Sequence, residues 1–159
     1  MNDQVRSSEA LQTLQVTAED EKVEVALKNS EAKMSAIFRA APTGIGVVSN
    51  RVILEVNEHF CELTGYTEDE LIGHSARIVY PSDEDFEAVG REKYRQIEQH
   101  GTGTVETRFR RKDGRIIDVL LSPSPLDPDQ IARGIIFTVI DITARKQAEN
   151  VLRESEEKF

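Results

Sequence analysis

The sequence predicts an α+β domain: a five-stranded antiparallel sheet with short helices on one face, flanked by an N-terminal and a C-terminal amphipathic helix. Residues 57–73, NEHFCELTGYTEDELIG, hold two short helix signals that each end at a glycine. Residues 104–122 alternate apolar and polar residues on both sides of an Asp-Gly pair, which is typical of a hairpin. Residues 1–36 are highly charged and contain neither glycine nor proline, which predicts the first flanking helix.

Apolar residues of the N-terminal helix fall on two stripes. One stripe consists of Leu11, Leu14, Ala18 and Val25, and the other of Val16, Val23, Leu27, Ser30, Met34 and Ile37. Spacings of three, four and seven are typical of a coiled coil, here with a change of register. The helix either pairs with a second helix or packs on its own domain. Pairing is favoured because no other surface is expected to cover residues 11–30.

Two strands are expected directly after this helix. Pro42 ends the helical pattern. Residues 44–49 and 51–56 then have the composition of short strands, and Asn50 predicts a tight connection between them.

Capping residues define the two short helices that follow. Asn57 is expected to cap the first helix, and Gly65 to end it. Thr67 and Glu70 have the spacing of a capping box for the second helix, which ends at Gly73.

A longer helix and three strands complete the predicted domain. The helix is capped by Ser82, runs to Gln99 and ends at Gly101. Its three following strands are expected at 104–112, 115–122 and 131–140. Prolines at positions 123, 125 and 128 are expected to break the sheet ladder. The continuous apolar run of the last strand predicts burial on both faces.

Composition limits the classes of function. The chain has 159 residues, 38% of them apolar, and a net charge of −9, which disfavours binding to nucleic acid or to an anionic membrane. The single cysteine permits no internal disulfide. Neither a signal peptide pattern nor an apolar run of membrane-spanning length occurs. We expect a cytoplasmic segment without direct membrane contact, and a parent protein anchored through other parts stays open.

Three segments resemble, in order, the motifs of PAS sensor domains. Residues 57–66 match N-x-x-F-x-x-L-T-G-Y, residues 111–114 read R-K-D-G, and residues 141–143 read D-I-T. The resemblance covers residues 35–145. It implies the PAS fold and a role in a bacterial-type signal-transduction protein, such as a multi-PAS sensor histidine kinase or a diguanylate cyclase.

Three parts are expected along the chain. Residues 1–36 form the N-terminal helix, residues 37–143 the PAS domain, and residues 144–159 a linker helix. Residues 27–34 and 152–159 have similar sequences, and in multi-PAS sensors a similar L-x-x-S-E-x-K-F segment opens the next PAS unit. The linker helix is therefore expected to lead to a further domain, such as another PAS domain.

No catalytic residue and no metal ligand is predicted. His59 and Cys61 are two positions apart, and residues at that spacing on a helix do not face each other. The three histidines, His59, His74 and His100, do not have the spacing of a metal site. The acidic runs at 68–70 and 83–85 are typical of helix N-termini.

The PAS resemblance also allows cofactors to be considered. Light-oxygen-voltage photosensors carry a reactive cysteine in G-x-N-C-R-F-L-Q, and residues 73–80 place Ala76 at that position. Haem sensors place a ligating histidine on the long helix, and residues 82–99 contain none. No cofactor is predicted. A non-covalent flavin, a haem or an unknown small-molecule ligand stays open.

A cavity between sheet and helices is implied by the same resemblance. Its expected wall consists of Val47, Leu54, Phe60, Leu63, Ile78, Phe86, Val89, Tyr94, Phe109, Val119 and Phe137. Polar groups that would orient a ligand are His74, Arg77 and Tyr80. The alternative is that the apolar residues fill the core at normal density.

The expected function is sensing and signal relay, without catalysis. Asp141 and Thr143 are the candidates for the joint between the last strand and the linker helix. Expected partners are a second copy, bound through the flanking helices, and an output domain of the same protein, such as a histidine kinase. The domain is a small-molecule sensor, a ligand-free dimerisation or relay module, or a sensor with a bound cofactor.

Overall fold

A computed structural model describes residues 2–157, and the last two residues of the predicted second L-x-x-S-E-x-K-F segment lie outside them. The described chain divides into two units between Phe38 and Arg39. The elements are α1 (Asn2–Ala40), β1 (Gly44–Ser49), β2 (Val52–Val56), α2 (Glu58–Thr64), α3 (Glu68–Leu71), η1 (Ala76–Val79), α4 (Asp83–His100), β3 (Val105–Arg110), β4 (Ile116–Pro125), η2 (Ile131–Arg133), β5 (Ile135–Asp141) and α5 (Thr143–Glu157).

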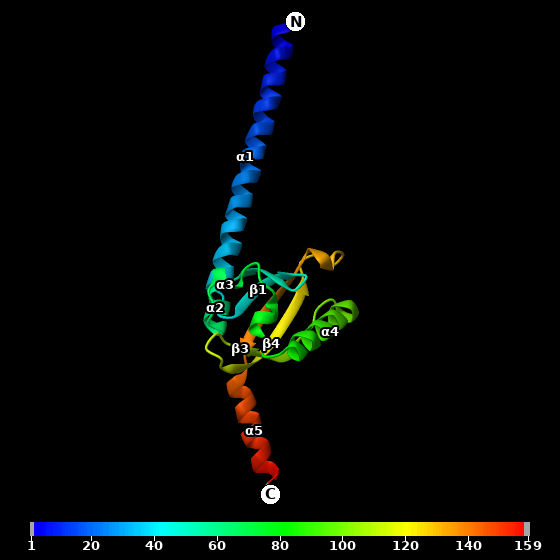
Figure 1. The fold of residues 1–159 in the computed structure, drawn as a ribbon. Helices are drawn as coiled ribbons and strands as arrows, with labels where there is room; N and C mark the ends of the chain where they lie inside the picture. Colours follow the sequence, from blue (N-terminus) through cyan, green and yellow to red (C-terminus); the bar gives the residue numbers. More distant parts are fainter. Residues whose placement is uncertain (1, 158–159) are drawn as a thin grey trace. The chain divides into compact units, whose positions relative to one another are not determined.

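The second unit contains the predicted five-stranded antiparallel sheet. Its strand order is β2-β1-β5-β4-β3, and every neighbouring pair is antiparallel. Helices α2 and α4 lie beside the sheet in Figure 1, and both supply residues to the hydrophobic core. The α+β fold class predicted from the sequence is confirmed.

Helix caps lie where the sequence predicts them. The Asn57 side chain accepts a hydrogen bond from the Phe60 N–H at 3.0 Å, and Gly65 ends α2 with a φ of 80°. The capping box of Thr67 and Glu70 is present in α3. These signals act within a few residues, so the rest of the fold does not change them.

Helix α4 also begins and ends as predicted. Ser82 caps it by accepting from the Asp85 N–H at 3.1 Å, and Gly101 ends it with a φ of 77°. Three side chains spaced four residues apart, Val89, Lys93 and Ile97, are buried. A lysine therefore occupies the middle of the face that α4 turns to the domain.

Strand β2 contains a β-bulge, which the sequence does not predict. Val47 pairs with Glu55, whereas Val48 pairs with Ile53, so Leu54 is an extra residue in β2. Ile53 is 1% exposed and Leu54 is 44% exposed. Leu54 therefore does not line the core, contrary to the prediction.

Strand β4 continues through two prolines that were expected to break it. Pro123 pairs with Phe137 and Pro125 with Ile135 in the ladder with β5. The Pro123 carbonyl accepts from Thr102 Oγ1 at 2.9 Å on the opposite side. Since N–H and C=O of one strand residue point the same way, the absent N–H would have pointed away from β5. Pairing between β3 and β4 has already ended at Leu121.

The last strand is shorter and more exposed than predicted. Residues 131–133 form the 3₁₀ turn η2, and Gly134, at a φ of 136°, separates this turn from β5. Val139 is fully buried, but its neighbour Ile140 is 50% exposed. The prediction of burial on both faces is therefore wrong, and a continuous apolar run did not distinguish the two faces.

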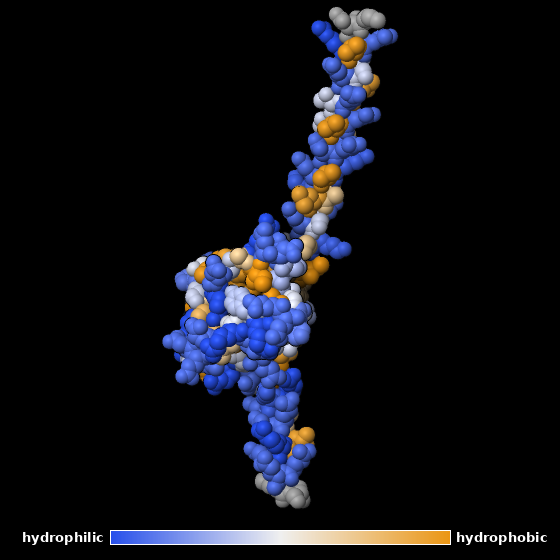
Figure 2. Space-filling model, turned by 90° about the vertical axis from the view of Figure 1, so that its right-hand side faces the viewer, coloured by the Kyte–Doolittle hydropathy of each residue, from blue (hydrophilic) through white to orange (hydrophobic). Residues whose placement is uncertain are grey.

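Apart from the partly buried Phe38, the described apolar side chains of α1 are exposed to solvent. Figure 2 shows them as hydrophobic spheres along the helix. Leu11, Leu14, Val23, Leu27 and Met34 are each between 57% and 68% exposed. Among the described residues, no helix has the length and apolar character needed to cross a membrane.

Candidate ligand-binding cavity

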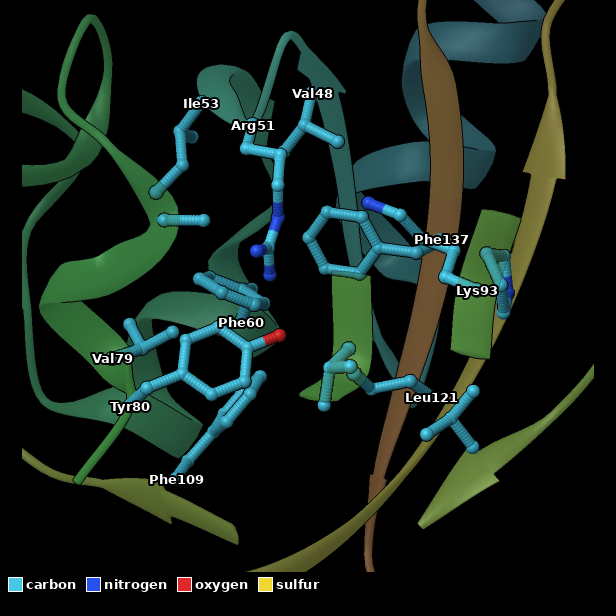
Figure 3. Close-up of a pocket in the computed structure, with 14 residues that line it drawn as sticks. Val48, Arg51, Ile53, Phe60, Val79, Tyr80, Lys93, Phe109, Leu121 and Phe137 are labelled. Carbon is cyan, nitrogen blue, oxygen red and sulfur yellow. The ribbon is translucent and has the colours of Figure 1, made fainter. Parts of the chain in front are cut away.

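A cavity of about 40 Å³ lies inside the domain, between the sheet and the helices (Figure 3). This is room for roughly three water molecules or for an organic molecule of a few non-hydrogen atoms. The residues that line it are Val48, Arg51, Ile53, Phe60, Ala76, Val79, Tyr80, Val89, Lys93, Val105, Phe109, Leu121, Pro123 and Phe137. All five strands contribute to this wall, together with α2, α4 and η1.

Aromatic rings form one side of the cavity. Phe60 makes edge-to-face contacts with Phe109 and Phe137, with ring centroids 6.4 and 5.7 Å apart, and Tyr80 makes another with Phe109 at 5.2 Å. Gly46, paired with Phe137 in the sheet, provides space for this ring, because a Cβ there would lie 2.5 Å from Phe137 Cζ. The rings are therefore held in place from several directions.

The polar atoms of the cavity come from Arg51, Tyr80 and Lys93. Burial raises the pKa of Tyr80 to about 12, although interaction with the Arg51 guanidinium opposes this effect. Burial, together with the charge of Arg51, lowers the pKa of Lys93 to about 8. At neutral pH the Tyr80 hydroxyl therefore keeps its proton, and the Lys93 ammonium is charged.

Several residues predicted from the sequence meet at the cavity. Phe60, Val89, Phe109 and Phe137 line it together with Tyr80. The remaining apolar predictions are core residues beside it: Leu63 and Val119 are buried, and Ile78 and Phe86 are partly buried against the core. Period-two and helical patterns therefore locate the aromatic side of the site.

Other predicted residues lie elsewhere. Val47 is buried but neighbours Val48 in the strand, and adjacent strand residues point to opposite faces. Leu54 is placed outside by the bulge. Tyr94 is 36% exposed, one position beyond Lys93 on α4. His74 is exposed.

Arg77 forms an ion pair instead of contacting the cavity. The Arg77 Nε lies 2.6 Å from Asp83 Oδ1, and the Arg77 Nη1 donates to the Tyr80 carbonyl at 2.7 Å. These contacts connect η1 to the start of α4.

Arg51 and Lys93 were missed by the sequence predictions. Arg51 lies in the turn between β1 and β2, where a charged residue normally points to solvent. Lys93 could have been found from the sequence, because it lies between Val89 and Ile97 on an apolar helical face. No local sequence signal marks Arg51 as a cavity residue.

Asp141 and Thr143, the predicted joint between β5 and α5, both form hydrogen bonds. The Thr143 N–H donates to Asp141 Oδ1 at 2.9 Å, so the Asp141 side chain accepts from the amide two residues on and fixes the turn into α5. Thr143 Oγ1 accepts from the Asp118 N–H of β4 at 3.0 Å, and the Ile142 N–H donates to the Asp118 carbonyl at 2.8 Å. The start of α5 is therefore bonded to Asp118, near the start of β4.

No catalytic arrangement is apparent around the single cysteine. Burial, with smaller contributions from Glu68, Glu58 and Glu62, raises the pKa of the Cys61 thiol, so the nucleophilic thiolate is disfavoured. Within residues 2–157, no group of three or more His, Cys, Asp or Glu side chains is placed to hold a metal ion.

Curated relatives of this chain are sensor proteins. It is 38% identical over 123 residues to the sensor protein TdiS of Thauera aromatica, which covers 77% of this chain and 22% of TdiS. It is 30% identical over 140 residues to the sensor histidine kinase TmoS of Ectopseudomonas mendocina, which covers 85% of this chain and 14% of TmoS. The chain thus spans less than a quarter of the length of these relatives.

Solved structures and a family model agree on the fold. The crystal structure of a PAS domain from Colwellia psychrerythraea superimposes with a TM-score of 0.65 at 23% identity, covering 71% of this chain and 97% of that chain. The model of the PAS domain family matches residues 42–144. The three motifs, the sheet order and these matches together show that this chain belongs to the PAS domain family of sensory modules.

Proposed function

We propose that this chain is the sensory module of a larger signalling protein, in which a small molecule in the cavity biases the sheet and α5 transmits the change. The strongest support for this proposal is that the same strands line the cavity and contact α5. β3, β4 and β5 contribute Val105, Leu121 and Phe137 to the cavity wall. β3 and β4 also hold the first turn of α5.

Ion pairs add to the hydrogen bonds between α5 and the sheet. Glu106 of β3 lies 2.5 Å from an Arg145 guanidinium nitrogen and 2.6 Å from Lys146 Nζ. Glu106 is on the face of β3 opposite to Val105, so a shift of the strand moves both its cavity side and its contact with α5. A coupling of about 1–3 kcal/mol is enough for useful allostery, and one or two such contacts supply it.

Asp141 tests this path. We predict that Asp141→Ala in the full-length parent protein reduces the ligand-dependent change in output several-fold, because the side-chain hydrogen bond that fixes the turn into α5 is lost. The cost to stability is about 1 kcal/mol, as for the loss of a helix cap, so the domain stays folded. The measurements are autophosphorylation, or the corresponding output of the parent, and circular dichroism of this chain.

Asp129→Ala is the matched control, since Asp129 is exposed in the loop between β4 and β5. An unchanged response in Asp141→Ala, with the control also unchanged, would rule out the Asp141 side chain as part of the relay.

The parts outside the PAS domain have proposed roles too. Residues 1–36 pair with the same segment of a second copy, and residues 144–159 lead to the next domain. Similarity to TmoS favours a histidine kinase as the output. This segment works in the cytoplasm and contacts neither membrane nor nucleic acid, and a parent protein anchored in the membrane through other parts stays open.

A ligand-free relay module is the second candidate. The small volume of the cavity, about 40 Å³, and the exposed apolar residues of α1 favour it. A native mass spectrum of the protein purified from cells separates the two. Extra mass that disappears on denaturation supports the ligand sensor, and an empty dimer supports the relay module. We propose no resident flavin or haem, and a coloured protein would contradict this.

A further inference from the structure

Two cationic side chains border the cavity without a carboxylate beside them. Lys93 is 7% exposed and Arg51 is half-buried, and none of the other lining residues is Asp or Glu. Within residues 2–157, no acidic side chain forms an ion pair with either. The carboxylate of Asp85, which acts on Tyr80 through its charge, is paired with Arg108 at 3.2 Å. Lys93 Nζ lies 5.1 Å from the centroid of the Tyr94 ring, a contact that leaves its charge unneutralised. A buried cation without a counter-anion is costly, so the site lacks a negative group.

The guanidinium of Arg51 is held in position by its neighbours. Its Cζ lies 3.4 Å from the centroid of the Phe86 ring and 5.8 Å from that of Tyr80. Gly90 leaves room for it, because a Cβ there would lie 2.8 Å from an Arg51 nitrogen. Figure 3 shows Arg51 and the Tyr80 hydroxyl both directed into the space between the lining side chains.

Arg51 also occupies a backbone position that favours glycine. Asn50 and Arg51 have φ angles of 50° and 62°, as in the two-residue hairpin turns for which Asn-Gly is the preferred pair. A non-glycine residue in this region is strained. The strained backbone thus carries the side chain that reaches the cavity.

We propose that the cavity binds a small organic carboxylate, whose anionic group lies between Arg51 and Lys93 and whose apolar part contacts Val48, Phe60 and Phe137. A guanidinium and a carboxylate form strong paired hydrogen bonds, and the ammonium of Lys93 adds a second charge. An inorganic anion would leave the apolar wall without a partner, which favours an organic acid. The volume restricts it to a few non-hydrogen atoms. This inference rests on the proposed sensory function and specifies its ligand.

Butyrate and butyramide test the proposal, since they have the same shape and differ in charge. We expect butyrate to raise the melting temperature of the complete 159-residue chain, and to bind at least tenfold more tightly than butyramide by isothermal titration calorimetry. Equal binding of the two, or no binding of any straight-chain acid from acetate to hexanoate, would overturn the proposal. This comparison needs only the unmodified protein.

Variants identify the two cations. Arg51→Gly suits the turn and Lys93→Met removes a buried charge, so both are expected to fold. Each should weaken butyrate binding at least tenfold without weakening butyramide. Arg91→Gln, which removes an exposed charge from α4, should leave butyrate binding unchanged. Full butyrate affinity in both Arg51→Gly and Lys93→Met would contradict the assignment.

The outcome for the ligand is separable from that for the relay. Equal binding of acid and amide overturns the anionic ligand but leaves a sensor of neutral molecules. An empty cavity together with altered output in Asp141→Ala overturns the ligand and leaves the relay. Selective butyrate binding with unaltered output in Asp141→Ala supports the ligand and removes the relay path.

Discussion

At the residue scale, Lys93 is the main departure from a simple apolar core. Its pKa is lowered from 10.5 to about 8, first by burial and second by the charge of Arg51. Below pH 8 the folded domain holds a buried ammonium without an anion. In the unfolded chain the same ammonium is hydrated. The free energy of unfolding at neutral pH is therefore lower by roughly 3 kcal/mol, at about 1.4 kcal/mol per pKa unit.

Stability should therefore depend on pH in a specific direction. Between pH 8 and 10.5 the unfolded chain binds more protons at Lys93 than the folded chain, so the free energy of unfolding rises with pH over this interval. We predict that Lys93→Met is more stable than the parent sequence by roughly 3 kcal/mol at pH 7, and that this difference decreases by pH 9.5.

Urea unfolding at several pH values, followed by circular dichroism, measures both quantities. The Tyr80 hydroxyl is common to both proteins, so its titration cancels. Arg91→Gln on the exposed side of α4 is the control and should show no such pH dependence. If the difference in the free energy of unfolding between Lys93→Met and the unsubstituted chain stays constant with pH, Lys93 is not the titrating group.

At the element scale, the R-K-D-G motif connects the β3–β4 hairpin to the short helices. Arg111 donates to the Leu63 carbonyl at 2.6 Å and to the Glu62 carbonyl at 3.3 Å, at the C-terminal end of α2. Its neighbour Lys112 forms an ion pair with Glu70 of the α3 capping box at 2.7 Å. The motif therefore fixes the loop and both helices relative to the sheet.

The two basic residues should differ in their contribution to stability. Arg111 is 21% exposed in its side chain and bonds carbonyls that have no helical partner, so Arg111→Ala should lower the free energy of unfolding by about 1.5–3 kcal/mol. Lys112 is 53% exposed, and its surface ion pair predicts a loss below about 1 kcal/mol for Lys112→Ala. Urea unfolding of both variants measures this difference, and equal losses would contradict it.

Elements fixed by local chemistry were predictable from the sequence, and those fixed by neighbours were not. The caps at Asn57, Thr67 and Ser82 depend on atoms within three residues. The bulge at Leu54 depends on pairing with β1, and the continuation of β4 through Pro123 depends on where β3 ends. Sequence patterns carry no information on these distant strands.

The same distinction applies to the cavity. Phe60, Phe109 and Phe137 follow from periodicity, because aromatic residues on the inner face of an element meet others in the core. Arg51 reaches the cavity only through the left-handed turn and the space at Gly90. Such long-range fit requires the folded structure.

At the scale of the whole molecule, the apolar stripes of α1 are exposed, and the proposed partner for them is a second copy of the chain. Each of Val23, Leu27 and Met34 is more than half exposed. Burying them against a second copy gains about 25 cal/mol per Å² of apolar surface. In proteins, packing of an apolar face supplies most of the stability of an amphipathic helix.

We predict that the chain is a dimer in sedimentation equilibrium and that residues 37–159 alone are a monomer. In the complete chain, Val23→Ser combined with Leu27→Ser should weaken the dimer, because both side chains lie on one stripe. Lys22→Ser combined with Lys28→Ser is the control, because its loss of helix propensity is at least as large while the apolar stripe is kept. A monomeric complete chain would exclude pairing through α1.

The position of the cavity has a consequence for the speed of the proposed signalling. Its wall is formed by all five strands together with α2, α4 and η1, so the exit of a bound molecule would require side chains or segments of this wall to move. Collective movements of packed elements occur over microseconds to milliseconds, much more slowly than a small molecule diffuses. A sensor with the proposed ligand would therefore respond to a fall in its concentration with a delay set by these movements, and would average over fluctuations shorter than that delay.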